Sequence, residues 1–338
     1  MSSAHRPHFV RPLLLDPSPF RVYSPPTQVP SQQFQCKEAG MSFRKALWAL
    51  TVVVCLAAPV AVQAQGDYLD VFIVKVKPEK TADFQALSKK WAEANRRYNG
   101  DRWLALESVY GEGNIYQFTS TRKDYADVDK TNEASMLAVN KAFGKEAALK
   151  IEQDFNSCLV WSRSELRRRR WDLSRKAPKD AEAYAKLIGE SRLLRTTAVH
   201  IRPGHVPDFE ALMKDVKETA EKNPDTQPVL VSQVLEGGKG AIFYVSTLRS
   251  SMGGFDHNPT TREILGEEGF KKFQQISADA VEVADSTLFR FNPELSNPPE
   301  EVAKVAMDFW RPKAVMAAAA KPKTSLEPVA AKEPTKKP

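Results

Sequence analysis

Cysteine is scarce in this sequence of 338 residues, which contains only Cys36, Cys55 and Cys158. The first two precede the predicted mature chain, and the one that remains cannot form an intrachain disulfide. Cys158 begins an apolar run that ends at Trp161. A buried, inert thiol is favoured there, because a catalytic thiol needs an electropositive, accessible setting with a base nearby. The sequence therefore excludes a disulfide-stapled fold and disfavours thiol catalysis.

Histidine and glycine motifs are missing as well. The five histidines form no H-x-x-x-H or H-E-x-x-H spacing and no cluster with cysteine, which argues against a zinc site. Gly237-Gly238 and Gly253-Gly254 suit turns and make no dinucleotide-binding fingerprint, and no G-x-S-x-G motif occurs. The sequence thus predicts no metal and no cofactor, and no motif names a catalytic residue.

Residues 41–64 have the layout of a secretory signal peptide. Arg44 and Lys45 precede a short apolar run at 46–58, and small residues end the segment at Val62-Gln63-Ala64. The run is shorter than the roughly 20 residues of a membrane-spanning helix, so no membrane span is expected after cleavage. We expect an exported bacterial protein, periplasmic or extracellular.

Residues 1–40 precede this signal and have neither helical nor strand periodicity. We expect them to be an untranslated upstream extension, with Met41 as the true start, because a signal peptide belongs at the N-terminus. Lys37-Glu38 can also be encoded as AAG-GAG, a bacterial ribosome-binding sequence, shortly before Met41.

The charge of the mature chain is small. The formal net charge is +7, and loss of residues 1–64 removes six basic and two acidic residues, which lowers it by four to +3. So small a charge on an exported protein gives no argument for a nucleic-acid partner. Residues 313–338 are mainly Ala, Lys and Pro. They predict a disordered tail, which could contact polymers of the cell envelope.

A strand–turn–helix pattern occurs twice. Residues 71–87 align without a gap with residues 196–212, so that Lys77-Pro78 matches Arg202-Pro203 and both copies share D-F-x-A-L. Each copy begins a longer series of elements. The predicted strands are Asp70–Lys77, Trp103–Tyr110, Ile115–Thr121 and Cys158–Ser164 in the first series, and Thr196–Arg202, Val229–Leu235, Ala241–Thr247 and Ser286–Phe291 in the second.

Apolar stripes predict helices between these strands, so each series reads β-α-β-β-α-β. The predicted organisation is one ferredoxin-like unit at 66–166, a connector with a helix at 167–192, a second unit at 193–296 and a C-terminal helix at 297–312. A match of Ser164-Glu165-Leu166 with Pro293-Glu294-Leu295 suggests that the duplication includes the trailing helices. The four arginines 167–170 are interpreted as part of a solvated connector.

This organisation resembles the dimeric α+β barrel superfamily, which includes the antibiotic-biosynthesis monooxygenase-like, NIPSNAP-like and EthD-like families and the chlorite dismutase group. The resemblance covers most of residues 68–296. It implies an α+β fold in which two ferredoxin-like sheets pack face to face as an intrachain barrel, with a pocket between the non-helical faces. It leaves oligomerisation open.

Strand alternation places several polar residues on that pocket side. Lys75 and His200 occupy matching positions on the first strands, and Glu107 and Gln233 on the second strands. The closing strands contribute Trp161, Arg163 and Arg290. These seven are the candidate residues for a small aromatic or anionic ligand. The alternative is that packing closes this face and leaves Lys75 and His200 exposed at its rim.

Three classes of function remain. The absence of catalytic motifs favours an exported, non-catalytic binding or interaction protein. The alternative is a cofactor-independent small-molecule monooxygenase-like enzyme. A haem-binding protein of the chlorite dismutase type is less favoured, because the resemblance implies a haem-ligating histidine on a helix of the second unit and the predicted helix 261–280 has none. The resemblance also implies that haem-degrading relatives have an asparagine on the first strand. This sequence has Asp70 and Thr196 on its first strands, which disfavours haem degradation.

Overall fold

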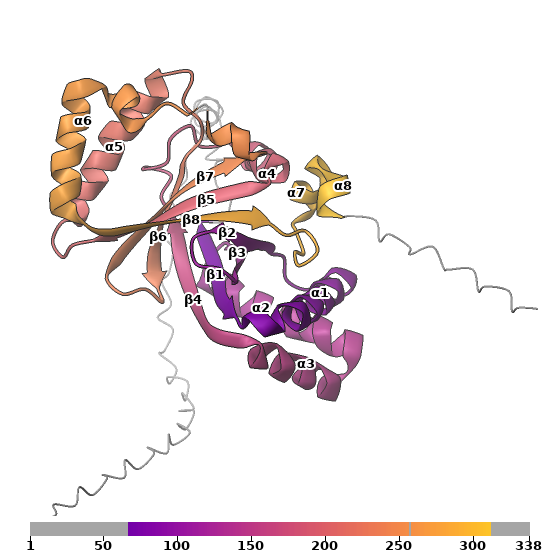
Figure 1. Ribbon diagram of the computed structural model, residues 1–338. Helices are drawn as coiled ribbons and strands as arrows, with labels where there is room; N and C mark the ends of the chain where they lie inside the picture. Colours follow the sequence, from indigo (N-terminus) through magenta and orange to yellow (C-terminus); the bar gives the residue numbers. More distant parts are fainter. Residues whose placement is uncertain (1–66, 257, 312–338) are drawn as a thin grey trace, which may run out of the picture. The chain divides into compact units, whose positions relative to one another are not determined.

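The computed structural model describes residues 67–256 and 258–311 (Figure 1). The predicted upstream extension, signal peptide and tail, at 1–40, 41–64 and 313–338, lie outside the described residues. The strands are β1 (Tyr68–Val76), β2 (Leu104–Tyr110), β3 (Ile115–Arg122), β4 (Leu159–Arg169), β5 (Leu193–Ile201), β6 (Leu230–Glu236), β7 (Ala241–Arg249) and β8 (Val281–Phe291). The helices are α1 (Thr81–Arg97), α2 (Tyr125–Phe143), α3 (Lys145–Ser157), α4 (Ala181–Glu190), α5 (Val206–Lys222), α6 (Thr261–Ala280), α7 (Glu300–Val305) and α8 (Met307–Trp310), with short 3-10 helices η1 (Pro78–Lys80) and η2 (Met252–Phe255).

The eight strands form one closed antiparallel barrel in the order β1-β3-β2-β8-β5-β7-β6-β4. Closure depends on the two longest strands. β4 pairs with β1 along its whole length, and its last residues also pair with β6, where Arg168 lies opposite Gln233. β8 pairs with β5 in the same way and then with β2, where Arg290 lies opposite Glu107. Each closing strand therefore joins the two halves of the chain.

The predicted packing of two ferredoxin-like sheets face to face is wrong. The two halves share backbone hydrogen bonds in a single closed barrel, so there are no two separate sheets. The physical reason is strand length. β4 and β8 are each 11 residues long, longer than the strands predicted from the sequence, and the additional residues reach the neighbouring half. Closure leaves no free sheet edge to be protected.

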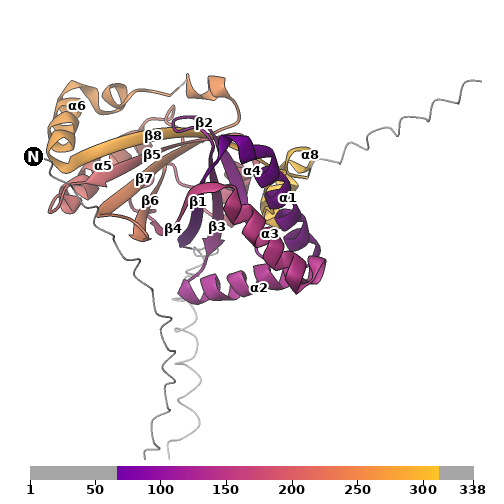
Figure 2. The same cartoon turned by 60° about the horizontal axis from the view of Figure 1, so that its bottom comes forward.

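Alternation along β1 agrees with the sequence pattern. Val71 and Ile73 are buried inside the barrel, whereas Val74 and Val76 pack on the outer side under α1. Figure 2 shows α1, α2 and α3 gathered beside the strands of the first half, with α5 and α6 beside those of the second. Between β3 and β4, where the order β-α-β-β-α-β predicts one helix, the chain forms α2 and α3, divided at Gly144, whose φ of 82° suits glycine.

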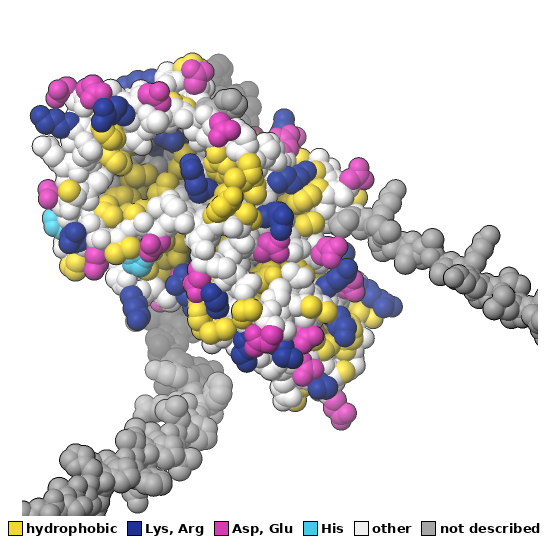
Figure 3. Space-filling view, in the orientation of Figure 1, with side chains coloured by type: hydrophobic (Ala, Val, Ile, Leu, Met, Phe, Trp, Pro, Cys, Tyr) yellow, Lys and Arg dark blue, Asp and Glu magenta, His cyan; other side chains and the backbone are white. Residues whose placement is uncertain are grey.

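Helices α4, α7 and α8 cover one end of the barrel. Ile188 of α4, Val302 of α7 and Trp310 of α8 belong to the same buried cluster as the inward side chains of β1, β2 and β8. The Trp310 indole is fully buried and donates a hydrogen bond from Nε1 to Gly189 O at 3.0 Å. None of the helices in the described residues is both long and apolar enough to cross a membrane. Basic and acidic side chains are interspersed on the face seen in Figure 3.

The four-arginine run was interpreted as a solvated connector, and this is wrong for two of its members. Residues 167–169 are the end of β4, so their side chains alternate between the two sides of the barrel wall. Arg167 and Arg169 point inward and are 4% and 6% exposed, whereas Arg168 between them is exposed. Two guanidinium groups are therefore buried inside the barrel.

A pair of buried serines anchors the segments that follow the closing strands. Ser174 Oγ accepts a hydrogen bond from Val231 N at 2.9 Å and donates one to Arg170 O at 2.8 Å. Ser296 Oγ accepts from Ala105 N at 2.9 Å and donates to Asn292 O at 2.7 Å. The segments that share this geometry are Asp172-Leu173-Ser174 and Glu294-Leu295-Ser296, so the sequence match of Ser164-Glu165-Leu166 with residues 293–295 was out of register.

Replacing Ser174 with alanine tests this anchor. The variant should lower the free energy of unfolding by about 1–3 kcal/mol, because the buried N–H of Val231 loses its acceptor. Urea denaturation followed by fluorescence measures the change. Ser162→Ala is the matched control on the exposed side of β4 and should change stability by less than about 0.5 kcal/mol. Equal effects of the two substitutions would contradict the anchoring role.

Candidate functional site

A cavity of about 510 Å³ lies between the outer face of the first half of the barrel and helices α1, α2 and α3. Its walls combine aromatic rings with polar groups. The aromatic residues are Phe72, Trp91, Trp103, Phe118 and Phe155. The polar residues are Asp70, Ser88, Asp101, Ser120, Arg122, Asn132, Ser135, Glu152, Asn156 and Ser164. A pocket of this size and composition suits a small, partly aromatic molecule.

Local sequence explains why these side chains converge. Asp70 and Phe72 on β1 and Phe118, Ser120 and Arg122 on β3 are alternate residues, so they share the outer face of the sheet. The helical residues on the facing side are Ser88 and Trp91 of α1, Val128, Asn132 and Ser135 of α2, and Glu152, Phe155 and Asn156 of α3. Spacings of three and four place each helical set on one helix face.

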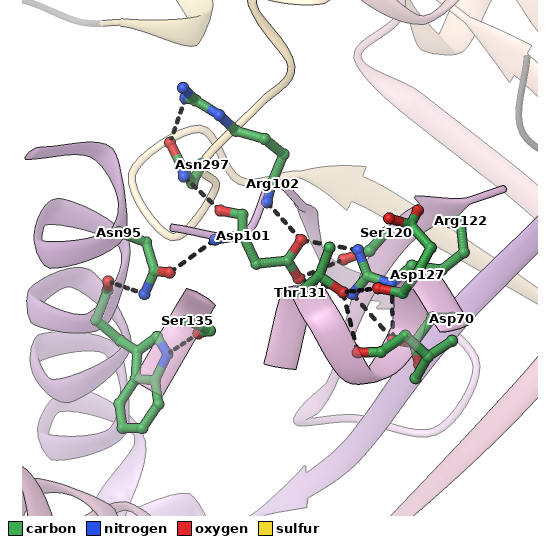
Figure 4. Close-up of polar contacts among 12 residues, drawn as sticks. Asp70, Asn95, Asp101, Arg102, Ser120, Arg122, Asp127, Thr131, Ser135 and Asn297 are labelled. Carbon is green, nitrogen blue, oxygen red and sulfur yellow. Dashed lines mark hydrogen bonds and ion pairs between the residues drawn. The ribbon is translucent and has the colours of Figure 1, made fainter. Parts of the chain in front are cut away.

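Arg122 is the centre of the polar side of the cavity and is 3% exposed (Figure 4). Its Nη1 and Nη2 donate to Oδ1 and Oδ2 of Asp101, both at 2.7 Å. Its Nε and Nη2 donate to Oδ2 of Asp70 at 3.2 and 3.0 Å. Burial acts to lower the pKa of Arg122, but the hydrogen bonds and charges of Asp101 and Asp70 outweigh it and raise that pKa. The guanidinium therefore stays charged.

Asp101 is fixed by the loop that carries it. Asp101 N donates to Asn95 Oδ1 at 3.0 Å, and Asn297 Nδ2 donates to Asp101 O at 2.6 Å. The preceding Gly100 is packed so closely that a Cβ there would lie 2.1 Å from Asn95 Oδ1. Arg102 N also donates to Asp101 Oδ1 at 2.7 Å. Both carboxylate oxygens of Asp101 are thus occupied, which suits a structural partner for Arg122.

Asp70 differs from Asp101 in access. Its side chain is 25% exposed, against 11% for Asp101. In the described part of the chain, the hydrogen bonds from the protein to its carboxylate all go to Oδ2 and none goes to Oδ1, and Asp70 lines the cavity. Such a carboxylate can accept a hydrogen bond or a proton from a bound molecule. Among residues 67–256 and 258–311, no group of three or more His, Cys, Asp or Glu could hold a metal ion.

The structure places four of the seven predicted site residues on the inward side of their strands. Lys75 Nζ forms an ion pair with Glu112 Oε1 at 2.8 Å, and Trp161 lies opposite Lys75 on β4. Arg163 pairs with Glu165 at 3.2 Å and stacks over the Trp161 ring at 5.8 Å. His200 lies on β5 between Ile242 and Val283 and is half-buried.

The other three predicted residues lie on the outer, helix-covered side. Arg290 donates from Nε and Nη2 to Glu107 Oε1 at 3.1 and 2.5 Å. Gln233 Oε1 accepts from Arg170 Nη1 at 2.8 Å, and the same nitrogen contacts Glu210 of α5. The structure therefore does not bring the seven into one pocket, and none of them lines the 510 Å³ cavity. Their role in ligand binding stays a prediction.

Sequence reasoning missed the Asp70–Arg122–Asp101 network. One signal was available, because Asp70 and Arg122 are charged residues on faces of β1 and β3 that carry mainly apolar and aromatic side chains toward the helices. A charge at such a position needs a buried partner. The partner Asp101 follows the Asn99-Gly100 turn and is brought in only by the tertiary fold.

No protein-family model and no curated protein sequence matches this chain. Solved structures do resemble it. A protein from Lactobacillus acidophilus NCFM named as a monooxygenase is 8% identical with a TM-score of 0.41, covering 66% of this chain and 93% of that chain. An anthrone oxidase-like protein is 12% identical with a TM-score of 0.44, covering 68% and 92%. A heme-binding protein from Thermus thermophilus is 14% identical with a TM-score of 0.39, covering 68% and 93%.

These comparisons correct the predicted function. The similar structures carry the names of monooxygenase, anthrone oxidase-like, chlorite dismutase and heme-binding proteins, and none of those names supports a non-catalytic binding or interaction protein. That prediction is wrong, and its alternative, a monooxygenase-like enzyme, fits the names better.

Removing the central cation tests the network. Arg122→Gln should lower the free energy of unfolding by about 3–5 kcal/mol, because it leaves two largely buried carboxylates without their partner. Chemical denaturation monitored by circular dichroism measures this loss. Arg262→Gln, which removes the exposed ion pair of Arg262 with Glu267, should cost no more than about 1 kcal/mol. A loss at Arg122 as small as that at Arg262 would show that the network does not hold the cavity wall.

Proposed function

We propose that this protein is a monooxygenase-like enzyme that oxidises a small aromatic molecule, held in the cavity beneath α1, α2 and α3, without a metal or a bound cofactor. The observation that carries the proposal is the combination of aromatic walls with the carboxylate of Asp70, which the buried Arg122 holds in place. Aromatic side chains favour a flat ring, and the carboxylate supplies a base at the cavity wall.

The substrate class follows from what a base can do. Asp70 takes a proton from an activated CH2 group that lies between aromatic rings, and the resulting carbanion transfers electrons to dioxygen. A C–O bond forms, and the peroxide receives a proton. Loss of the second C–H proton breaks the O–O bond and releases water, so that CH2 and O2 become C=O and H2O. The oxidant is dioxygen and no further reductant is needed.

Within this proposal, each group in the network has one role. Asp70 is the general base and touches the substrate. Arg122 positions Asp70 through Oδ2, and Oδ1, to which the protein donates no hydrogen bond in the described residues, accepts the proton. Asp101 accepts hydrogen bonds from Nη1 and Nη2 of Arg122 and thereby holds the guanidinium in place; it does not contact the substrate. Trp91 is held by the hydrogen bond from its Nε1 to Ser135 Oγ at 3.2 Å, which fixes one wall.

We also propose that the enzyme acts after export, in the periplasm or outside the cell, and that it is related to the NIPSNAP-like branch of the superfamily through a tandem duplication. The support is the signal-peptide layout of residues 41–64 and the repeated pattern at 71–87 and 196–212. Contact of the tail at 313–338 with envelope polymers belongs to the same proposal.

Oxygen consumption tests the enzymatic proposal. The protein with anthrone, which has an acidic CH2 between two rings, should consume dioxygen and form the quinone in equal amounts, measured with an oxygen electrode and by absorbance. Asp70→Asn should lower kcat by about 100-fold or more, since a general base contributes about 10²–10⁴-fold. Asp83→Asn, at a carboxylate 60% exposed on α1, should leave the rate unchanged. Equal rates for the two variants, both shown to be folded, would refute the role of Asp70.

Mass spectrometry tests export. In a bacterial host, the secreted or periplasmic product should begin at Gln65, because Ala64 ends the predicted signal. Substituting Val62 and Ala64 with bulky residues should block cleavage and leave the longer form. An intact mass that includes residue 1 in the exported fraction would contradict both the signal and the proposed start at Met41.

A further inference from the structure

A second, smaller cavity lies inside the barrel and has no part in the proposed reaction. Its volume is about 90 Å³, several times the roughly 10–15 Å³ that one water molecule needs. One side carries the guanidinium groups of Arg167 and Arg169. Across the barrel from β4, strands β2 and β5 contribute Leu104 and Leu194, and β6 beside β4 contributes Leu230. The cavity therefore combines two guanidinium groups with aliphatic side chains.

The buried charges of this interior do not cancel. Glu165 is 3% exposed, and Arg167 contacts its Oε2 with Nε at 2.8 Å and Nη2 at 2.7 Å. Tyr244 donates its hydroxyl to Oε1 of the same carboxylate at 3.2 Å. Burial raises the pKa of Tyr244, so the phenol stays neutral and adds no negative charge. Glu165 pairs with Arg167 and also with the more exposed Arg163, so it is not left to balance the charge of Arg169.

Arg169 is held by weaker contacts. Its Nη2 donates to Thr121 Oγ1 at 3.0 Å, and its guanidinium lies 4.4 Å from the ring centre of Tyr184 and 5.4 Å from that of Trp171. Its Nε is buried and has no hydrogen-bond partner within the described residues. A buried cation that lacks a carboxylate and keeps an unused donor is costly. The site is therefore built to receive an acceptor that carries negative charge.

We propose that the barrel cavity binds a short-chain carboxylate, with the carboxylate on Arg169 and the alkyl chain against the leucine side chains. The negative charge of the ligand compensates the positive charge of Arg169, which Glu165 does not compensate. The hydroxyl groups of Ser232 and Ser246 also line the cavity and can donate to a carboxylate oxygen. A cavity of this size has room for about five or six heavy atoms, which matches propionate.

Calorimetric titration of the protein with propionate tests the proposal, with propionamide as the neutral molecule of the same shape. Propionate should bind at one site per chain and propionamide should not bind. Arg169→Gln should weaken propionate binding by about tenfold or more, as expected for loss of a hydrogen bond to a charged group. Arg168→Gln, which makes the same charge change on the exposed side of β4, should leave the affinity unchanged.

Three other outcomes would contradict the binding of a carboxylate at Arg169. Equal weakening by Arg169→Gln and Arg168→Gln would assign the binding to the general surface charge. Equal binding of propionate and propionamide to the unsubstituted protein would show that the cation is not used, and that comparison needs no folded variant. If Arg169→Gln does not fold, Ser232→Leu, which fills the cavity without changing its charge, should abolish propionate binding. Retained affinity there would place the ligand elsewhere.

Discussion

The hydrogen bonds that join β4 to β6 and β8 to β2 are the constraint on which the rest of this structure depends. Without them, each half would be an open sheet with two exposed edges and one uncovered face. With them, the inward residues of all eight strands share one interior. That interior must be filled by side chains from both halves and closed by α4, α7 and α8, whose apolar residues join the same cluster.

Closure also decides where a ligand can fit. The barrel interior is filled by side chains of eight strands, so only about 90 Å³ remains there. The helices on the outer side are held away from the sheet by large aromatic residues, and in the first half they leave about 510 Å³. The sequence predicts the pocket between the non-helical faces, which is the barrel interior, and that interior contains the smaller of the two cavities. The larger one lies under the helices.

Much of the fold follows from the sequence because alternation is a local property. Along β1, simple alternation puts Val71 and Ile73 on one face and Val74 and Val76 on the other, and the structure agrees. Strand length is not local. The run 167–170 carries four like charges, which normally mark a solvated segment. Its first three residues nevertheless continue β4, because β1 and β6 both supply hydrogen bonds to them. Glu165 lies beside Arg167 on the same face of β4, whereas Tyr244 on β7 is brought to the pair only by the fold.

The candidate site was harder to predict, because the partners of Asp70 and Arg122 come together only in the folded chain. A comparison of the two halves shows where base chemistry can occur. Asp70 on β1 lies opposite Ser120 and Leu166, and Arg195 on β5 lies at the corresponding place, opposite Thr247 and Leu288.

Two residues beyond these partners, β3 ends with Arg122 and β7 ends with Arg249. The first half therefore sets a carboxylate against its arginine, whereas the second half sets two arginines together over the ring of Phe255. Burial, with the charges of Arg195 and Arg175, lowers the pKa of Arg249. A cationic wall of this kind cannot accept a proton from a substrate. The proposed reaction is therefore confined to the half of the barrel that holds Asp70, although both halves share one topology.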